Sequence, residues 1–299
     1  MGNILFIGTA GFSYRDWEGI VYPTDLKKRK IHPLEYLAQF FDCCEVNTSF
    51  YGPLRPNVGK NWCKRVAEVN RNFNFTAKLY QGFTHVPKGT KPPSPFSLTV
   101  SAEEEKLTRE GLDSIAAEDK LGALLIQFPV SFKNKDDTRD YLFALIDKFK
   151  QYPLVLEIRH ESWDDPDILA RLAAEGVGFC NIDQPILGRS IGATEHVTAR
   201  VGYVRLHGRN YQEWFQAANR DDRYDYLYKR PELEGWKNKI ENIGQRTEKT
   251  FAITNNHHEG QAAVNALELK NMLSGARVKA PRRLVEHYPD HLKDIADSI

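Results

Sequence analysis

Short apolar runs alternate with amphipathic stretches along nearly the whole of this 299-residue chain. The runs that we expect to form strands are Ile4–Thr9, Cys43–Ser49, Phe73–Leu79, Leu121–Phe128, Leu154–Arg159, Gly178–Asp183, Tyr203–His207 and Phe251–Asn255. They recur at a mean spacing of about 35 residues, which is typical of repeated strand–helix units. Several are apolar almost throughout, as parallel strands covered on both faces are. The pattern predicts an α/β fold with eight parallel strands.

The segments between these runs have helical periodicity. Leu142, Leu145, Ile146 and Phe149, for example, fall on one face of a helix. Eight strand–helix units need about 250 residues, so the chain is long enough for one closed (β/α)₈, or TIM, barrel. We therefore expect residues 1–299 to form a single TIM-barrel domain. An open doubly wound sheet is the weaker alternative, because no GxGxxG follows the first run.

Composition argues against several classes of protein. A net charge of +1 is low for a protein that mainly binds duplex nucleic acid. No apolar run approaches the roughly 20 residues that span a bilayer, and the first residues lack signal-peptide features, so we expect no membrane partner. The four cysteines, Cys43, Cys44, Cys63 and Cys180, contain no CxxC pair. We expect them to be buried in a protein of the reducing cytoplasm.

Two connections between predicted strands are long. Gln81–Val100 follows the third strand and is rich in proline, with Pro87, Pro92, Pro93 and Pro95. Gly208–Arg230 follows the seventh strand and is aromatic and charged. Both lie at the face where barrel enzymes keep their active sites. Loops of this length usually close over a ligand or carry recognition.

Polar side chains gather at or just after the ends of the predicted strands, which is where barrel active sites lie. The candidate catalytic residues there are Glu45, Lys78, Glu157, Asp183 and His207. The candidate substrate-binding residues are Tyr14, Asn47, Tyr51, His85, Gln127, Arg159, Arg205, Arg209, Asn255 and Asn256. So many polar strand ends in succession predict a ligand pocket.

Alternation of side chains along a strand places these charges on shared faces. With a period of two, Glu157 shares a face with Arg159, and Glu45 shares one with Asn47. Buried charges must pair, shift their pKa or hold a ligand, because unpaired burial costs several kcal/mol. The residues that we expect around one cavity are Glu45, Lys78, Glu157, Asp183, Arg205 and His207. An ionic network that merely closes the barrel mouth is the structural alternative.

Seven motifs follow one another in order: Gly8–Tyr14, Glu45–Tyr51, Phe75–Lys78, Leu125–Pro129, Glu157–His160, Tyr203–Arg209 and Thr254–His257. Through them, residues from about 4 to 273 resemble the YecE-like family, a domain of unknown function with a TIM-barrel fold. The resemblance leaves 274–299 as a C-terminal extension, either a final helix over the barrel bottom or a contact segment. It implies the barrel and the pocket but no reaction.

The first functional hypothesis is an enzyme that acts on a polar anionic substrate, such as a sugar phosphate or a phosphodiester. The basic residues expected to bind phosphate or carboxylate are Lys78, Arg159, Arg205 and Arg209. Glu157 and Asp183 are expected to act as acid or base, and His207 to move a proton near neutral pH. We predict no obligatory cofactor.

A metal-dependent isomerase or nuclease-like hydrolase is an alternative. Glu157, Asp183 and His207 would supply the oxygen and imidazole ligands that Mn²⁺, Mg²⁺ or Zn²⁺ accept. Arg159 and Arg205 argue against this site, because fixed positive charge lowers the affinity for a cation. A divalent metal therefore stays an alternative to the metal-free pocket.

A non-catalytic nucleic-acid-binding protein is the other alternative. The aromatic residues of the loop Arg209–Arg230 are Tyr211, Trp214, Phe215, Tyr224, Tyr226 and Tyr228. Aromatic rings among basic residues can stack on bases. The loop has five positive and four negative charges, however, which leaves +1 and a weak attraction for phosphate. We therefore favour the interpretation that this loop packs as a cover over the barrel mouth. The sequence leaves the oligomeric state open.

Overall fold

The computed structural model describes residues 2–85, 100–211 and 222–299. Its central sheet consists of β1 (Ile4–Ala10), β2 (Cys43–Val46), β3 (Asn74–Lys78), β4 (Leu121–Gln127), β5 (Leu154–Glu157), β6 (Gly178–Asp183), β7 (Val201–Leu206) and β8 (Lys249–Thr254). Neighbouring strands are parallel, and β8 pairs with β1, so the sheet closes. This confirms the predicted eight-stranded parallel barrel.

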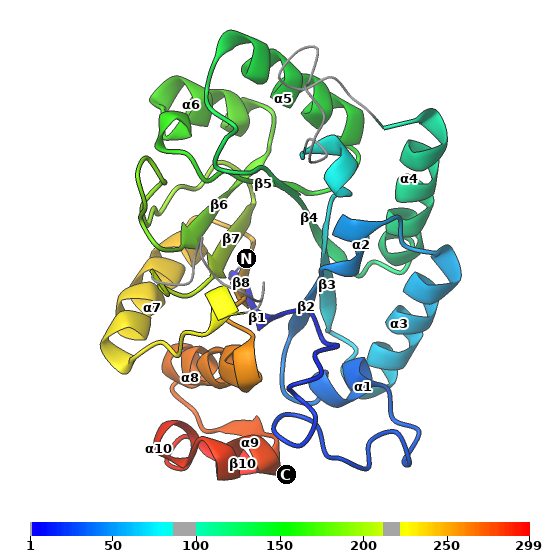
Figure 1. Cartoon of the computed structure of the whole chain (residues 1–299), viewed down its shortest axis with the longest axis vertical. Helices are drawn as coiled ribbons and strands as arrows, with labels where there is room; N and C mark the ends of the chain where they lie inside the picture. The colour runs from blue at the N-terminus through cyan, green and yellow to red at the C-terminus, as the bar shows by residue number, and fades with distance from the viewer. Residues whose placement is uncertain (1, 86–99, 212–221) are drawn as a thin grey trace.

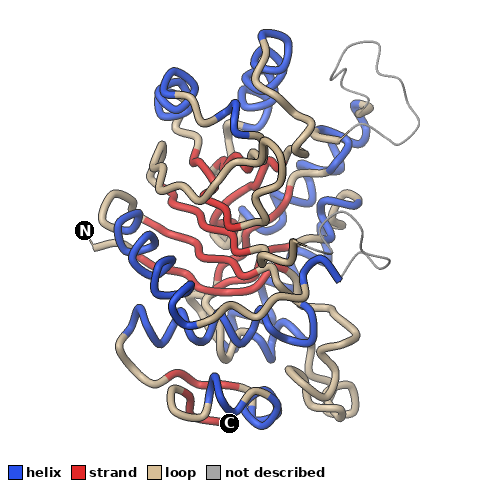
Figure 2. Tube along the Cα trace, turned by 60° about the vertical axis from the view of Figure 1, so that its left-hand side comes forward, coloured by secondary structure: helices blue, strands red, loops and turns tan. Residues whose placement is uncertain are grey.

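Helices surround the barrel on the outside (Figures 1 and 2). They are α1 (Pro33–Leu37), α2 (Thr48–Tyr51), α3 (Pro56–Val69), α4 (Ala102–Ala116), α5 (Asp136–Phe149), α6 (Pro166–Ala174), α7 (Arg230–Gly244) and α8 (Gln261–Ser274). Short 3₁₀ turns lie at η1 (Gln81–Phe83), η2 (Glu161–Trp163), η3 (Asp222–Tyr224) and η4 (His258–Gly260). Within the described ranges no helix has the length and apolar character that crossing a membrane requires.

Local capping explains where some helices begin. Ser101 and Glu104 form the capping box at the start of α4, each bonding the other's backbone N–H. Asp165 caps α6 by accepting hydrogen bonds from the N–H groups of the second and third residues of the helix, and Pro166 occupies the first position. These side chains satisfy donors that have no partner inside the helix.

Aromatic rings fill the barrel interior away from the C-terminal ends of the strands. Phe6 of β1 and Phe251 of β8 stack with their ring centroids 4.8 Å apart, and Tyr203 of β7 lies 6.0 Å from Phe251. Gly122 of β4 makes room for this layer, since a Cβ there would lie 2.2 Å from the Phe251 ring. The apolar layer leaves space for polar side chains only toward the C-terminal ends of the strands.

β2 and β5 end two or more residues before the predicted runs do, at Val46 and Glu157 instead of Ser49 and Arg159. β2 ends at Val46, and Asn47 has helical backbone angles because α2 starts directly after it. The Ser49 hydroxyl holds this turn in place by donating to the backbone oxygens of Val46 and Lys78. Asn47 therefore does not share a strand face with Glu45, contrary to our prediction.

The C-terminal extension packs beside the barrel, on the outer side of α8 (Figure 1). It comprises β9 (Val278–Ala280), α9 (Arg282–His287), α10 (Pro289–Leu292) and β10 (Ala296–Ser298). Leu284 and Leu292 are buried in the same hydrophobic cluster as residues of α8, and His291 bonds Glu268 of α8 at 3.0 Å. The extension is thus neither a final helix nor a cover for the barrel bottom, because its apolar residues meet α8.

The two long connections are described only in part. Pro87, Pro92, Pro93 and Pro95 lie outside the described residues. Trp214 and Phe215, with the rest of 212–221, also lie outside them. All four cysteines are free and buried, which confirms our interpretation of them as buried residues.

Candidate functional site

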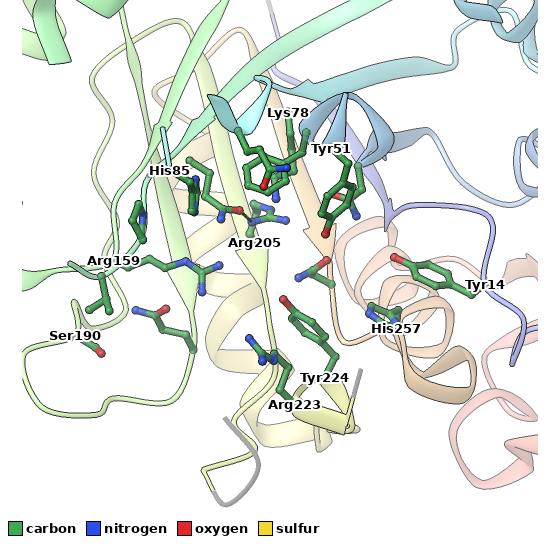
Figure 3. Close-up of a pocket in the computed structure, with 18 residues that line it drawn as sticks. Tyr14, Tyr51, Lys78, His85, Arg159, Ser190, Arg205, Arg223, Tyr224 and His257 are labelled. Carbon is green, nitrogen blue, oxygen red and sulfur yellow. Dashed lines mark hydrogen bonds between the residues drawn. The ribbon is translucent and has the colours of Figure 1, made fainter. Parts of the chain in front are cut away.

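A pocket of about 420 Å³ lies at the C-terminal ends of the strands (Figure 3). Nine of the predicted site residues line it: Tyr14, Asn47, Tyr51, Lys78, His85, Gln127, Arg159, Arg205 and Asn255. Nine further residues line it without having been predicted: Phe50, Gln81, Pro129, Val130, Gln184, Ser190, Arg223, Tyr224 and His257. The strand ends thus supply the floor, and the segments after them supply the walls.

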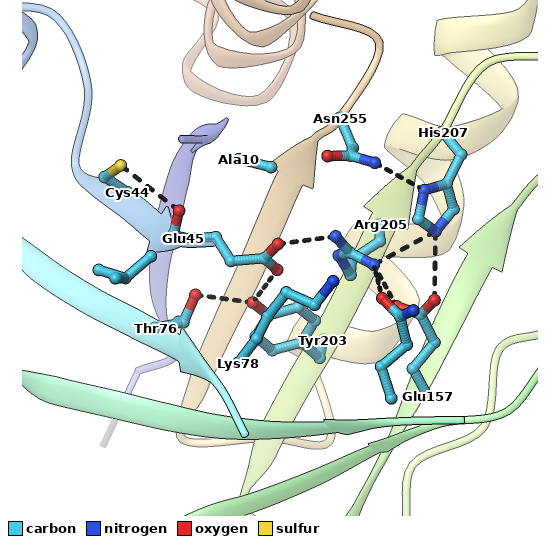
Figure 4. Close-up of polar contacts among 12 residues, drawn as sticks. Ala10, Cys44, Glu45, Thr76, Lys78, Glu157, Tyr203, Arg205, His207 and Asn255 are labelled. Atoms are coloured by element: carbon cyan, nitrogen blue, oxygen red, sulfur yellow. Dashed lines mark hydrogen bonds and ion pairs between the residues drawn. The ribbon is translucent and has the colours of Figure 1, made fainter. Parts of the chain in front are cut away.

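A chain of alternating charges runs across the floor of this pocket (Figure 4). Arg205 of β7 donates from Nη2 to Oε1 of Glu45 in β2 at 2.6 Å, and from Nη1 to Oε2 of Glu157 in β5. Arg159 donates from Nε and Nη2 to Oε1 of Glu157 at 3.0 and 2.8 Å. The Tyr203 hydroxyl donates to Oε2 of Glu45 at 2.9 Å. These paired side chains, called the charge chain below, therefore link β2, β7 and β5 across the barrel.

The two carboxylates of the charge chain form their hydrogen bonds within it. The side chains of Glu45 and Glu157 are fully buried, and each of their oxygens accepts a hydrogen bond. Burial alone would raise the pKa of Glu157, but Arg205 and Arg159 outweigh burial and hold that pKa well below its usual range. Neither carboxylate reaches the pocket lumen, so in this arrangement they orient the arginines.

Lys78 is the last residue of β3 and, unlike Arg159 and Arg205, has no ionic partner among the residues that the structure describes. Its Nζ lies 4.2 Å from the centroid of the Phe50 ring, and it enters none of the ion pairs found among the described residues. Burial first, and then the charge of Arg205, lowers the pKa of Lys78 to about 7. In a large share of the molecules, this side chain is therefore a neutral amine at neutral pH.

His207 lies just after β7 and is fully buried beside the charge chain. Its Nδ1 lies 2.9 Å from the Asn255 side-chain nitrogen, and its Nε2 lies 3.5 Å from Oε1 of Glu157. Burial, together with the charges of Arg159 and Arg205, lowers the pKa of His207 to about 3. The imidazole stays neutral at pH 7, so its surroundings do not suit the proton transfer near neutral pH that we expected of it.

Asp183 faces away from the pocket. It ends β6 opposite Leu206 of β7, whereas Ile182 lies opposite the inward-facing Arg205. Its carboxylate accepts from Nε of Arg209 at 2.9 and 3.1 Å. The prediction that Asp183 joins the common cavity is therefore wrong, because successive side chains of a strand point to opposite faces.

Arg209 and Asn256 also lie off the pocket, contrary to our predictions. Arg209 holds Asp183 and donates from Nη1 to Glu232 of α7 at 3.0 Å. The Asn256 side-chain nitrogen donates to the backbone oxygen of Tyr226 and to Asn265 of α8, each at 2.8 Å. Both side chains thus tie strand ends to the surrounding helices.

His257 is a pocket residue that our predictions missed, although it lies three residues after the end of β8, near the strand ends where barrel sites occur. Its ring stacks on Tyr14 with centroids 4.2 Å apart, and Trp17 donates to its backbone oxygen at 2.7 Å. Tyr224 of η3 lies on the same ring at 4.9 Å. Residues such as Tyr224 come from loops without periodicity, so no sequence pattern marks them.

The predicted metal ligands are not brought together. Glu157 and His207 lie side by side, but Asp183 points toward the helices. No cluster of three or more His, Cys, Asp or Glu side chains able to hold a metal ion occurs in the described part of the chain. The alternative site formed by Glu157, Asp183 and His207 is therefore contradicted by its geometry.

The charged side chains that line the described pocket, Lys78, Arg159, Arg205 and Arg223, are all basic. Fold and site together define a (β/α)₈-barrel protein with a polar, cation-lined pocket at the C-terminal ends of its strands. The chain belongs to the family described as "Protein of unknown function DUF72", which matches residues 6–288. This confirms the family membership that the seven motifs predict.

Relatives of the chain extend over nearly its full length. It is 30% identical over 297 residues to the UPF0759 protein YunF of Bacillus subtilis (strain 168). The match covers 94% of this chain and 99% of YunF. It is similar to a DUF72 family protein from Thermotoga maritima MSB8, with a TM-score of 0.75, 30% identity, and coverage of 91% of this chain and 100% of that one.

A second solved structure is a DUF72 family protein from Enterococcus faecalis V583. The TM-score is 0.75 at 25% identity, and the match covers 91% of this chain and 96% of that one. These matches support the fold along the whole barrel. The description of the family assigns no function.

Proposed function

We propose that this protein is an enzyme that acts on a small, polar, anionic substrate in the pocket at the strand ends. One observation carries the proposal: the charged groups that line the described pocket are all basic, while Glu45 and Glu157 lie fully buried beneath it. Guanidinium groups pair well with phosphate and carboxylate. Among the described residues of the pocket, an anion would meet positive charge and no exposed carboxylate.

The rest of the lining favours a polyhydroxylated molecule such as a sugar phosphate. Carboxamides line the pocket at Asn47, Gln81, Gln127, Gln184 and Asn255. Such groups both donate to and accept from hydroxyl groups. A volume of about 420 Å³ lies within the range of small-molecule sites, which favours a metabolite over a polymer such as duplex nucleic acid.

Lys78 is the group that we assign to proton transfer. A general acid or base works best when its pKa lies near the working pH, and Lys78, with a pKa of about 7, meets that condition. Glu45 and Glu157 act as positioning residues, because they hold the guanidinium groups of Arg205 and Arg159 in place. Preorganised charge of this kind needs no rearrangement when the substrate binds.

Thermal-shift screening of paired ligands tests the proposal. We expect sugar phosphates to raise the melting temperature and the corresponding neutral sugars to leave it unchanged. A ligand at 100 times its Kd adds about 2.7 kcal/mol of stability. The Arg159→Gln variant should lose the shift, whereas Arg189→Gln, which alters an exposed arginine paired with Glu161, should keep it. No shift with any anion, or an unchanged shift in Arg159→Gln, would refute the proposal.

A further inference from the structure

Lys78 is held in a defined position at the pocket. Its backbone oxygen accepts a hydrogen bond from the Ser49 hydroxyl at 2.7 Å, and its Nζ lies over the Phe50 ring. The residue is 8% exposed and lines the pocket, so the cavity reaches an otherwise buried side chain. Figure 4 shows its Nζ between the Glu45 and Glu157 ends of the charge chain, close to Arg205.

We propose that the Lys78 amine forms an imine with the carbonyl carbon of the substrate, whose class is then an aldehyde or ketone bearing a phosphate or carboxylate. The inference rests on the proposed function and deepens it, because it keeps the same pocket and anionic substrate but gives the Lys78 amine the role of nucleophile in place of proton transfer. It also narrows the substrates from polar anions in general to those with a reactive carbonyl group.

The surroundings of Lys78 favour the nucleophilic form of its amine. Lysines become nucleophiles when they are desolvated in an apolar pocket or placed next to another cation. The pocket of Lys78 is polar, but burial and the Phe50 ring desolvate its Nζ, and Arg205 and Arg159 lie nearby in the charge chain. The charges of Glu45 and Glu157 act in the opposite direction and raise the pKa of Lys78, but both carboxylates form their ion pairs with arginines, and burial together with Arg205 and Arg159 outweighs them.

The same arrangement supplies an anchor for the charged end of the substrate. Arg159 lines the pocket, its side chain is 15% exposed, and its Nε and Nη2 are fixed by Glu157. In Figure 3, Arg159 and Lys78 both border the cavity, with Arg205 between them. A phosphate or carboxylate near Arg159 would leave a carbonyl group of the same molecule within the cavity that Lys78 faces.

The covalent step balances without a further reactant. The nitrogen lone pair of neutral Lys78 bonds to the carbonyl carbon, and the carbonyl π electrons move to oxygen. A proton passes from nitrogen to that oxygen and gives a carbinolamine. The hydroxyl then leaves as water with one proton taken from solvent, and the nitrogen lone pair forms the C=N bond of a protonated imine. One water molecule is released for each imine formed.

Borohydride trapping tests the inference directly. The whole protein is incubated with glycolaldehyde phosphate, reduced with sodium borohydride, and analysed by intact-mass spectrometry and peptide mapping. Borohydride supplies hydride to the imine carbon and leaves a stable secondary amine. We expect one adduct per chain, located on Lys78 and at least tenfold more abundant than with neutral glycolaldehyde. The yield should rise to half its maximum near pH 7.

Two variants complete the experiment. Lys78→Arg keeps a positive charge but cannot form an imine, so it should lose the adduct. Lys28→Arg replaces an exposed lysine and should retain it. If Lys78→Arg does not fold, the mapped position of the adduct in the unaltered protein decides. Adducts spread over many lysines, or an equal yield in Lys78→Arg, would overturn the inference.

A parallel thermal shift with inorganic phosphate separates the two proposals. If phosphate stabilises the protein and this effect requires Arg159, but no adduct forms on Lys78, the imine is refuted and the anionic pocket stands. If no anion stabilises the protein and no adduct forms, both proposals fail.

Discussion

The guanidinium of Arg205 in β7 binds the carboxylate of Glu45 in β2 across the barrel interior, with Nη2 and Oε1 2.6 Å apart. The two residues are 160 positions apart in the sequence, and both side chains are essentially inaccessible to solvent. Arg205 also binds Glu157, so one cation serves two buried carboxylates. The free energy of this arrangement depends on every member being present, because an uncompensated buried charge is costly.

Glu45→Gln should lower the free energy of unfolding by about 3 kcal/mol, since removing one partner of a buried ion pair typically costs 3–5 kcal/mol. Urea denaturation followed by circular dichroism measures the change. Asp147→Asn, which removes an exposed pair with Lys150, is the matched control and should change stability by less than about 1 kcal/mol. Equal effects of the two substitutions would contradict the buried network.

Stability should fall in acid as Glu157 becomes protonated. Its pKa in the folded protein is lower than in the unfolded chain, so the unfolded state binds more protons as pH falls below the usual value of 4.5. The contribution of Glu157 is present above pH 4.5 and is lost as pH falls through the folded pKa. Glu157→Gln should flatten this part of the curve of unfolding free energy against pH. An unchanged slope below pH 4.5 would count against the ionised, arginine-bound carboxylate.

Lys78→Met should stabilise the protein at pH 6, although it removes a pocket residue. The folded pKa of about 7 lies below the ordinary 10.5, so the unfolded state binds more protons between these values. Lys78 therefore costs stability fully below pH 7, and the cost shrinks as pH rises toward 10.5. Each pKa unit corresponds to about 1.36 kcal/mol, so we expect a gain of a few kcal/mol. Denaturation at pH 6 and pH 10 gives the comparison, and a gain that does not shrink at pH 10 would contradict the titration.

Asp183→Asn should lower stability without affecting ligand binding, because Asp183 pairs with Arg209 outside the pocket. We expect a loss of about 1–3 kcal/mol in the free energy of unfolding, the cost of leaving a polar partner unsatisfied. Isothermal titration with a pocket ligand should give a Kd within twofold of the original. A tenfold weaker binding would contradict this prediction and show that Asp183 contributes to the ligand site.

Chelation should have no effect on thermal stability, because Asp183 does not join Glu157 and His207 in one ligand set. A resident metal would add stability that EDTA removes. Melting curves with EDTA and with added Mn²⁺ should agree within about 1 °C. A drop of several degrees with EDTA would show a metal bound elsewhere in the chain or in a different geometry.

Most of the barrel could be predicted from local patterns. Each strand is a short apolar run, and runs such as Leu121–Gln127 are buried on both faces because helices cover the sheet. Exact strand ends were less predictable. The turn at Asn47 depends on the Ser49 hydroxyl reaching the backbone of the neighbouring strand, which is a contact between distant segments.

The candidate site was predicted in part. Lys78, Arg159 and Arg205 follow from the rule that strand ends carry the chemistry of a barrel. Ser190 and Tyr224 reach the pocket from loops, where no periodicity shows which way a side chain points. The sequence also did not show that Glu45 and Glu157 form ion pairs with arginines, because this pairing depends on the distance between strands that are far apart in the sequence.

The sequence by itself determined the number of strands, their parallel arrangement and the gathering of polar residues at one end, because these follow from periodicity along the chain. Tertiary structure decided which of those polar residues meet. Closing the barrel turns alternate side chains inward, so Arg205 enters the charge chain while Asp183, on the adjacent strand, contacts the helices. That closure also leaves Lys78 without a carboxylate partner at the described pocket, since the arginines occupy both carboxylates first.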